Sequence, residues 1–387
     1  MIDFTLTDEQ QMLIQMTHDF VEKEMLPHEE TLERTDTLPP KLAASLKKRA
    51  IELGLHACNL PEEVGGGGLD AVSVMLIEKE LGRTSLALAE CAHRPLNILA
   101  SCEGEQVTKF LEPTIRGEKR DCIAMTEPGA GSDLRGMKCK AVLEKDEWII
   151  NGEKHFISQA SISDYCVLFA ATGEDETDKG LKKRISAFLV DFNDHGVEVA
   201  SGYKNVSHRG YTNNILRFDN ARIPRWRIMG PEGDGFRIVN QWLGPTRLTV
   251  AATCVARAER AFEIALNYSA TREQFGQKIG KFQGISFELA DMATEIKMAN
   301  LMLLETAWKI DQGSVTPEDC AMTKLFCSEM LSRVADQSIQ TVGGMGLMED
   351  LPLERIWRDA RLERIWDGTS EIQRHIISRG LLRPLEK

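Results

Sequence analysis

The sequence lacks the features of a membrane or exported protein. It contains no run of about 18 apolar residues, so it predicts no membrane-spanning helix. Its first residues, MIDFTLTDEQQ, lack the basic start and apolar core of a signal peptide and the Arg-rich pattern of a transit peptide. We therefore expect a cytoplasmic protein that is not bound to a membrane.

Positive charge is also in deficit. The chain has 47 Lys and Arg against 59 Asp and Glu, a net charge of −12. Binding of nucleic acid through a basic face needs clustered Lys and Arg, so the composition argues against a nucleic-acid partner. The ordinary interpretation of this acidity is solubility.

Paired cysteines are missing as well. The nine cysteines are scattered and form no Cys-x-x-Cys motif. An odd number of such residues in a large chain is typical of reduced, buried thiols in a cytosol. No group of His, Cys, Asp or Glu has the spacing of metal ligands, so we expect no metal site.

The apolar pattern changes twice along the chain. With 387 residues, two or three domains are expected. Residues 1–120 show helical spacing, and Thr7 with Gln10 predicts a capping box at the first helix. Residues 121–232 contain short segments rich in β-branched and aromatic residues, and Asn151-Gly152 predicts a hairpin turn.

The last part, residues 233–387, is helical again. Three long amphipathic stretches cover about 237–272, 281–312 and 317–342. Long helices joined by short loops favour an antiparallel bundle. The order helical, β, helical predicts an α+β protein.

Three glycine- or arginine-containing motifs could hold a nucleotide cofactor. In AMTEPGAGSDLRG (124–136), Thr126, Ser132 and backbone amides suit a flavin edge or a diphosphate, although a plain turn would look the same. SATREQFGQKI (269–279) places an arginine beside an aromatic residue, which can hold a diphosphate or be a solvated helix end. QTVGGMGLMED (340–350) could also be an ordinary helix C-cap.

Together with PEEVGGGG, INGEKHFIS, ERIWRDAR and DGTSEIQR, these motifs resemble the acyl-CoA dehydrogenase family over nearly the whole chain. The resemblance implies an N-terminal all-α domain (1–120), a middle β-barrel domain (121–232) and a C-terminal four-helix bundle (233–387). It also implies FAD between the last two domains, completed by a neighbouring subunit of a homotetramer or dimer. The implied activity is dehydrogenation of an acyl-CoA, with electrons passing to an electron-transferring flavoprotein.

The resemblance assigns FAD contacts residue by residue. Thr126 would contact the flavin pyrimidine edge and Ser132 the diphosphate, and Phe156 and Ser158 stand where many members carry Trp and Thr beside the flavin. The FAD of the adjacent subunit would be met by Arg272, Gln274, Phe275, Gln340 and Gly344. The adenosine side would be met by Thr369 and Glu371, although Glu371 is often Gln in relatives.

Asp367 is the candidate proton acceptor. The family's base is usually a Glu at this position, or else a Glu at the position of Thr246, which cannot act as a base. Asp367 is therefore the only carboxylate that matches either site, with a side chain shorter than Glu by one C–C bond, about 1.5 Å. Its backbone N–H would help to polarise the thioester oxygen. The alternative is an N-cap of the last helix, although Thr369 or Ser370 could supply that cap.

Other residues have weaker assignments. Arg247 would support the site electrostatically, or form only a helix-face ion pair, and Trp366 would wall the acyl pocket or belong to the core. Glu90, His93 and Arg94 would put polar groups at the far end of the acyl pocket, which hints at a short, polar or carboxylated acyl group, although exposed positions on a helix are the ordinary alternative. Glu90, Arg94 and Thr246 are the further candidates for contact with the substrate.

Besides dehydrogenation, two alternatives stay open at this point: a different reaction within the superfamily, and a role without catalysis. Aspartate as the base is also a feature of nitroalkane oxidases, and other members of the superfamily are enoyl-CoA reductases or desulfinases. A non-catalytic scaffold that binds flavin or CoA is the second alternative. The carboxylate at Asp367 argues against that scaffold.

Overall fold

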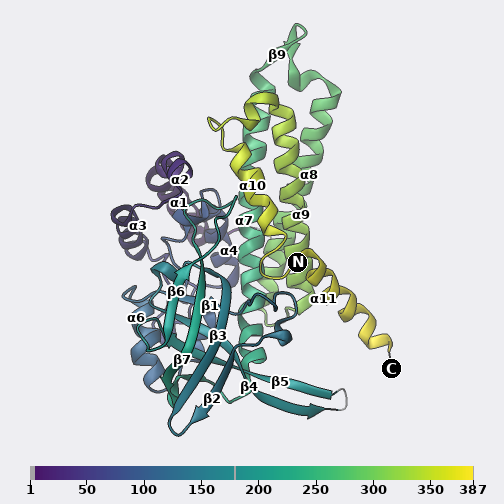
Figure 1. Cartoon of the computed structure of the whole chain (residues 1–387). Coiled ribbons are helices and arrows are strands. Elements are labelled where there is room, and N and C mark those ends of the chain that lie inside the picture. Colours follow the sequence, from purple (N-terminus) through teal and green to yellow (C-terminus); the bar gives the residue numbers. More distant parts are fainter. Residues whose placement is uncertain (1–4, 178–179, 387) are drawn as a thin grey trace.

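The computed structural model describes residues 5–177 and 180–386, and it has three parts (Figure 1). The N-terminal part is helical, with α1 (Asp8–Phe20), α2 (Glu29–Thr35), α3 (Pro40–Glu52), α4 (Ala71–Leu81), α5 (Leu86–Ala89) and α6 (Glu112–Ile115). The predicted capping box is confirmed: Gln10 N donates to Thr7 Oγ1, and Thr7 N donates to Gln10 Oε1, both at 3.1 Å.

The middle part is a curled eight-stranded sheet. Its strands are β1 (Asp121–Ala124), β2 (Lys140–Glu144), β3 (Glu147–Ser158), β4 (Tyr165–Thr177), β5 (Gly180–Asp191), β6 (Val197–Ser201), β7 (Asn213–Pro224) and β8 (Ile228–Met229). They pair in the order β6-β7-β3-β2-β4-β5-β8, and β1 adds to β4 in parallel. Strand β1 ends directly before the glycine-rich loop, so the sheet positions that loop.

The predicted hairpin turn at Asn151-Gly152 is wrong. Both residues lie inside β3, where the register against β7 shifts between Ile150 and Gly152. The turn between β2 and β3 lies at Lys145 and Asp146 instead. Gly152 is needed for another reason: its φ is 146°, and a Cβ there would lie 2.7 Å from the Cα of Cys139.

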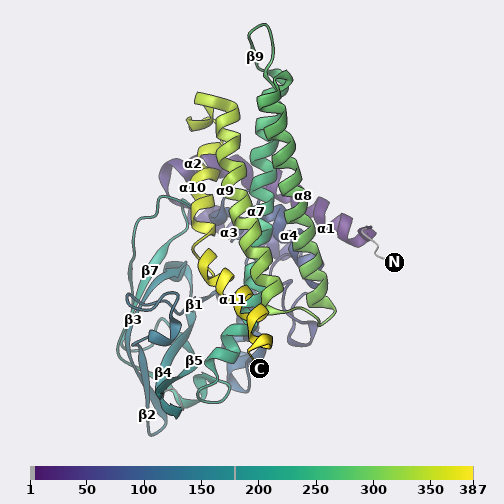
Figure 2. The same cartoon turned by 90° about the vertical axis from the view of Figure 1, so that its right-hand side faces the viewer.

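The C-terminal part is built from long helices, α7 (Gly235–Thr271), α8 (Gln283–Asp311), α9 (Pro317–Val342), α10 (Leu353–Glu363) and α11 (Ser370–Leu382). The first three lie side by side (Figure 2), and a short β9–β10 hairpin (Glu273–Gln274, Gln277–Lys278) joins α7 to α8. The three predicted long stretches are therefore confirmed. No helix among the described residues is long and apolar enough to cross a membrane.

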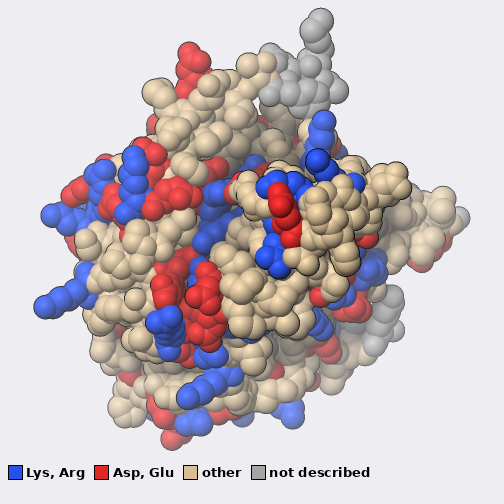
Figure 3. Space-filling model, turned by 90° about the horizontal axis from the view of Figure 1, so that it is seen from above, with Lys and Arg blue, Asp and Glu red and all other residues tan. Residues whose placement is uncertain are grey.

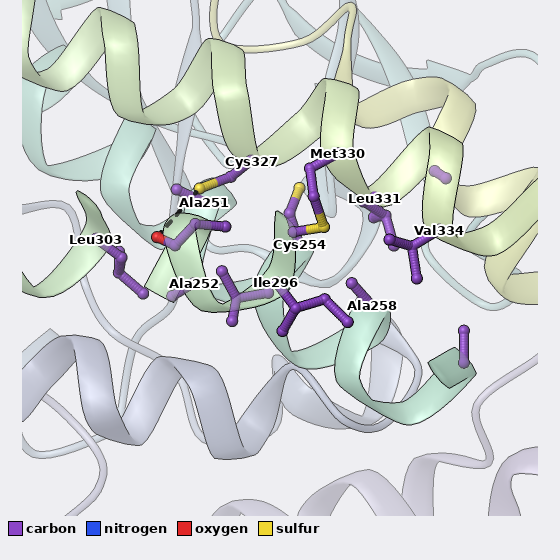
Figure 4. Close-up of a cluster of buried hydrophobic side chains, with 14 of the residues drawn as sticks. Ala251, Ala252, Cys254, Ala258, Ile296, Leu303, Cys327, Met330, Leu331 and Val334 are labelled. Carbon is purple, nitrogen blue, oxygen red and sulfur yellow. Dashed lines mark hydrogen bonds between the residues drawn. The ribbon is translucent and has the colours of Figure 1, made fainter. Parts of the chain in front are cut away.

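Small side chains let α7 pack closely between its neighbours. Ala251, Ala252 and Ala258 of α7 are fully buried against Ile296 of α8 and Val334 of α9 (Figure 4). Helix α4 packs on α7 and α8 as well, so the N-terminal part is anchored to the bundle. This close packing fixes the faces of α4 and α7 that line the cavity described below.

A buried carboxylate ties the N-terminal helices to the bundle. Glu29 of α2 accepts bonds from Arg260 Nη1 and Nη2 of α7 at 2.9 and 2.8 Å and from Arg355 Nη2 of α10 at 2.6 Å. Burial disfavours its charge, but the two guanidinium groups outweigh this and hold the pKa of Glu29 below its usual value.

We predict that Glu29→Gln lowers the free energy of unfolding by about 3–5 kcal/mol, because it leaves buried cations without their counter-charge. The matched control is Glu30→Gln, one residue along, whose partner Arg34 is exposed. That change should cost less than about 1 kcal/mol. Urea unfolding of both variants measures the difference, and equal losses would contradict the prediction.

Candidate active site

A cavity of about 520 Å³ lies where the N-terminal helices, the sheet and α7 meet the segment before α11. Of the candidate residues from the sequence, it brings together Glu90, Arg94, Ser158, Thr246, Trp366 and Asp367. It also exposes residues that the sequence alone did not single out, among them Asn59, Glu78, Arg120, Asp121 and Tyr211. No motif links these five, because they come from four separate segments of the chain and meet only in the fold.

Asp367 sits in a strained turn between α10 and α11. Its φ is 51° and that of Gly368 is 92°, so two successive residues adopt left-handed backbone. Lys324 Nζ from α9 donates to Gly368 O at 2.9 Å, and Gln373 Nε2 donates to the same oxygen at 2.8 Å. Strain of this kind persists only where the surroundings impose it, as these two donors do.

The carboxylate of Asp367 faces the cavity and forms no hydrogen bond or ion pair with any described residue. Burial raises its pKa to about 6, against the opposing charges of Lys324 and Arg247, while Glu363 adds to the rise. Its backbone N–H also donates to no residue in the described part of the chain. A carboxylate and a donor on one residue are therefore both free for a ligand.

The capping role belongs to another residue. Thr369 is the N-cap of α11, and its Oγ1 accepts from Ile372 N at 3.3 Å. Glu371 lies exposed in the first turn of the same helix. The cap therefore gives no reason for an aspartate at position 367.

Trp366 is fixed by a charged network that reaches the sheet. Its Nε1 donates to Glu363 Oε2 at 2.6 Å, and its ring stacks on His208 at 5.2 Å. Glu363 also pairs with Arg257 of α7 at 2.6 Å. Burial lowers the pKa of His208, but Asp359 and Glu363 outweigh it and raise the pKa overall. The loop before β7 is thereby held against α10.

Arg247 is buried in α7 beside the cavity, with 7% of its surface exposed. Its guanidinium forms no hydrogen bond or ion pair with any described residue, and Nε is buried without a partner. Burial lowers its pKa, and Cys320 and Asp367 oppose that effect. A buried cation without a partner is costly in a folded protein, which indicates a bound group nearby.

Part of the cavity wall is lined by paired charges. Arg94 Nε and Nη2 donate to Glu78 Oε1 and Oε2 at 2.6 and 2.8 Å. Arg120 Nη2 donates to Glu90 Oε2 at 3.0 Å. Glu90 and Arg94, predicted from the sequence, therefore lie in the cavity wall, and both have partners in the protein.

The sheet and the glycine-rich loop carry residues that suit a planar cofactor, and one of them, Ser158, lines the cavity. His155 N donates to Thr126 O at 2.7 Å, which joins β3 to the glycine-rich loop. The Thr126 hydroxyl has no partner among the described residues, and Phe156 is 58% exposed. Ser158 and Tyr211 both line the cavity, close to each other. A free hydroxyl, an exposed ring and this serine fit a flavin, while Ser132 lies exposed farther along the loop.

The remaining candidates lie elsewhere. Arg272, Gln274 and Phe275 belong to the β9–β10 hairpin, at the end of α7 farthest from the sheet (Figures 1 and 2). They are exposed, as are Gln340 and Gly344 at the end of α9. The face at this end carries interspersed acidic and basic side chains (Figure 3). A single chain therefore does not bring these five residues to the cavity.

Comparisons with known proteins identify the family. The chain matches the N-terminal, middle and C-terminal domains of acyl-CoA dehydrogenases at residues 7–118, 122–221 and 233–382. It is 38% identical over 389 residues to the probable acyl-CoA dehydrogenase YngJ of Bacillus subtilis (strain 168), covering 99% of this chain and 100% of the relative.

Solved structures agree. Butyryl-CoA dehydrogenase from Megasphaera elsdenii has a TM-score of 0.90 and 31% identity, covering 99% of this chain and 100% of the other. A chain from a structure of the electron transferring flavoprotein of Acidaminococcus fermentans has a TM-score of 0.87 and 33% identity, with 99% and 100% covered. The chain therefore belongs to the acyl-CoA dehydrogenase family of FAD-dependent oxidoreductases.

Proposed function

We propose that the protein dehydrogenates an acyl-CoA to the 2,3-enoyl-CoA, with Asp367 as the base. The observation that carries this proposal is the carboxylate of Asp367, which faces the cavity without a protein partner and has its pKa raised to about 6. A base with a pKa near the working pH is suited to general base catalysis. Asp367 does not cap α11, so its carboxylate is available for proton transfer.

The reaction breaks two C–H bonds of the acyl group. A carboxylate oxygen of Asp367 takes the α-proton, and the free N–H of the same residue donates to the thioester oxygen as charge develops there. When bound, FAD supplies the acceptor for the hydride that leaves the β-carbon. The electron pair of the α C–H bond becomes the new double bond. Arg247, a buried cation close to Asp367, opposes proton retention by the carboxylate.

Thr126, Phe156 and Ser158 would hold the flavin ring against the sheet, with Ser132 at the diphosphate. Thr369 and Glu371 would meet the adenosine side. Arg247 would support the site electrostatically, and Trp366 and Thr246 would line the acyl pocket together with Glu90 and Arg94. The shared cavity lining of Ser158, Thr246, Trp366, Glu90 and Arg94 supports their roles.

A second copy of the chain would complete the cofactor site, in a homotetramer or a dimer. Phe275 is 95% exposed at the hairpin tip and Phe287 is 61% exposed on α8, an unusual cost for aromatic side chains facing water. Arg272, Gln274, Gln340 and Gly344 would then reach the FAD of the neighbour. The similarity to a chain solved with an electron transferring flavoprotein supports such a flavoprotein as electron acceptor. Nine buried free thiols suit a reducing cytoplasm.

We predict that Asp367→Asn lowers the rate of flavin reduction by an acyl-CoA at least 100-fold, because an amide cannot take the proton. FAD content should stay unchanged. Anaerobic rapid mixing measures the rate, and Asp219→Asn, an exposed change on β7, is the control. Reduction of Asp367→Asn at a near-normal rate would remove Asp367 from the mechanism.

The rate should also depend on pH. Only ionised Asp367 accepts a proton, and its pKa is about 6, so reduction should be fast above that pH and slow below it. Between about pH 7.5 and about pH 5.0 we expect a loss of about tenfold. The same titration by rapid mixing, with FAD content checked at each pH, tests this. A rate independent of pH over that range would contradict an ionising base.

The last prediction concerns the hairpin. Arg272→Ala should weaken FAD retention on gel filtration, because a guanidinium that pairs with a diphosphate is lost from the neighbouring site. The control is Arg222→Ala on β7, which removes an equally exposed arginine of the sheet. Equal FAD content in both variants would contradict a role for Arg272 across the interface.

A further inference from the structure

We propose that the paired charges in the cavity lining form a closed end wall that selects a compact, uncharged acyl group. The wall consists of three pairs: Glu78 with Arg94, Glu90 with Arg120, and His93 with Asp121. This inference rests on the proposed function, since it names the class of acyl-CoA that would fit the same cavity.

The wall is built from separate elements that lock one another. Glu78 lies on α4, Glu90 ends α5, and Asp121 begins β1. His93 Nε2 bonds Asp121 Oδ1 at 2.6 Å, and Asp121 Oδ2 also accepts from Leu96 N at 2.9 Å. The side chains of Glu78 and Asp121 are only 4% and 0% exposed. A ligand that pushed into this wall would have to separate buried charges, which is strongly unfavourable.

The wall lies close to the reacting centre. Tyr211 lines the cavity near Ser158, and its ring is 6.4 Å from that of Trp366. Burial raises the pKa of Tyr211, and the charges of both Glu90 and Asp367 add to this rise, so one side chain lies near both carboxylates. If the reacting carbons of a substrate lie between Asp367 and Ser158, the rest of its acyl chain therefore meets Tyr211 and Glu90 within a short distance.

The charges also argue against a carboxylated acyl group. The cavity is lined by six acids (Asp70, Glu78, Glu90, Asp121, Asp311 and Asp367) against two arginines (Arg94 and Arg120) and His93. Both arginines are already bound to glutamates. A second carboxylate on the substrate would find acidic neighbours and no unpaired arginine among the residues that line the cavity. The unpaired Arg247 lies outside this lining and near Asp367. Of the three acyl classes predicted from the sequence, this geometry disfavours the carboxylated one.

Some polar atoms of the cavity lining have no hydrogen-bond partner among the described residues. Asn59 Oδ1, His93 Nδ1 and Arg120 Nε are buried in the cavity lining and lack a hydrogen-bond partner in the described part of the chain. Such atoms would be left uncompensated beside a long alkyl chain. A compact acyl group that stops short of the wall leaves room for water beside them.

The test measures affinity separately from chemistry. In Asp367→Asn with FAD bound, calorimetry gives the dissociation constants of butyryl-, isobutyryl-, octanoyl- and glutaryl-CoA. An open apolar pocket gains roughly fourfold in affinity per added methylene. We expect octanoyl-CoA to bind no tighter than butyryl-CoA, isobutyryl-CoA to match butyryl-CoA, and glutaryl-CoA to bind at least tenfold more weakly. Octanoyl-CoA binding tenfold tighter than butyryl-CoA, or glutaryl-CoA binding equally well, would overturn the proposal.

A paired substitution locates the effect in the wall. Glu90→Leu with Arg120→Leu, made in the same background, removes both charges together and should raise the octanoyl-to-butyryl affinity ratio at least tenfold. The control, Lys79→Leu with Glu259→Leu, removes a pair of similar burial outside the cavity lining. An unchanged ratio in a folded Glu90/Arg120 variant would overturn the proposal. If that variant does not fold, the four affinities above decide alone.

Failure of the proposed dehydrogenation would give a different set of results from failure of the proposed wall. If native protein were reduced by none of these thioesters while the affinities followed the expected order, the dehydrogenation would be wrong and the wall would stand. If reduction occurred and octanoyl-CoA bound tenfold tighter than butyryl-CoA, the wall would be wrong and the dehydrogenation would stand.

Discussion

The bond from Lys324 Nζ to Gly368 O is the interaction on which the site depends. Lys324 is fully buried on α9, and its ammonium group has a carbonyl oxygen as its only hydrogen-bond acceptor among the described residues. That bond helps to keep Asp367 and Gly368 in left-handed backbone, at a position where Asp367 lines the cavity. The charge of Lys324 also limits how far burial raises the pKa of Asp367, so position and basicity are set together.

The short side chain of Asp367 constrains where the substrate can lie. The side chain of Asp367 is shorter by about 1.5 Å than the glutamate that the sequence motifs lead us to expect at a base position. A displacement of about 1 Å can cost on the order of 100-fold in rate, so the turn must bring the backbone closer or the substrate must lie nearer. The network of Trp366, Glu363 and His208 fixes the chain just before Asp367 against the sheet. A compact acyl group held by the wall of paired charges would lie close to such a base.

Much of the fold could be predicted from the sequence because its signals are local. The capping box at Thr7 and the long helical repeats depend on residues three or four apart. Asn151-Gly152 wrongly predicted a turn because glycine is favoured both in turns and where another part of the backbone approaches closely. Here Gly152 accommodates the close approach of Cys139. The site was predictable only in part. Asp367, Glu90 and Arg94 lie in recognisable stretches, whereas Arg120, Asp121 and Tyr211 join them only through tertiary contacts, for which no local pattern exists.

The most direct test of Asp367 as the base isolates the proton step. A thioester with oxygen in place of its β-CH₂ cannot release a β-hydride, so exchange of its α-hydrogens with D₂O, followed by NMR, reports proton abstraction alone. Native protein with FAD should exchange these hydrogens at least 100-fold faster than Asp367→Asn at equal saturation. Equal exchange rates in the two proteins would show that another group removes the proton.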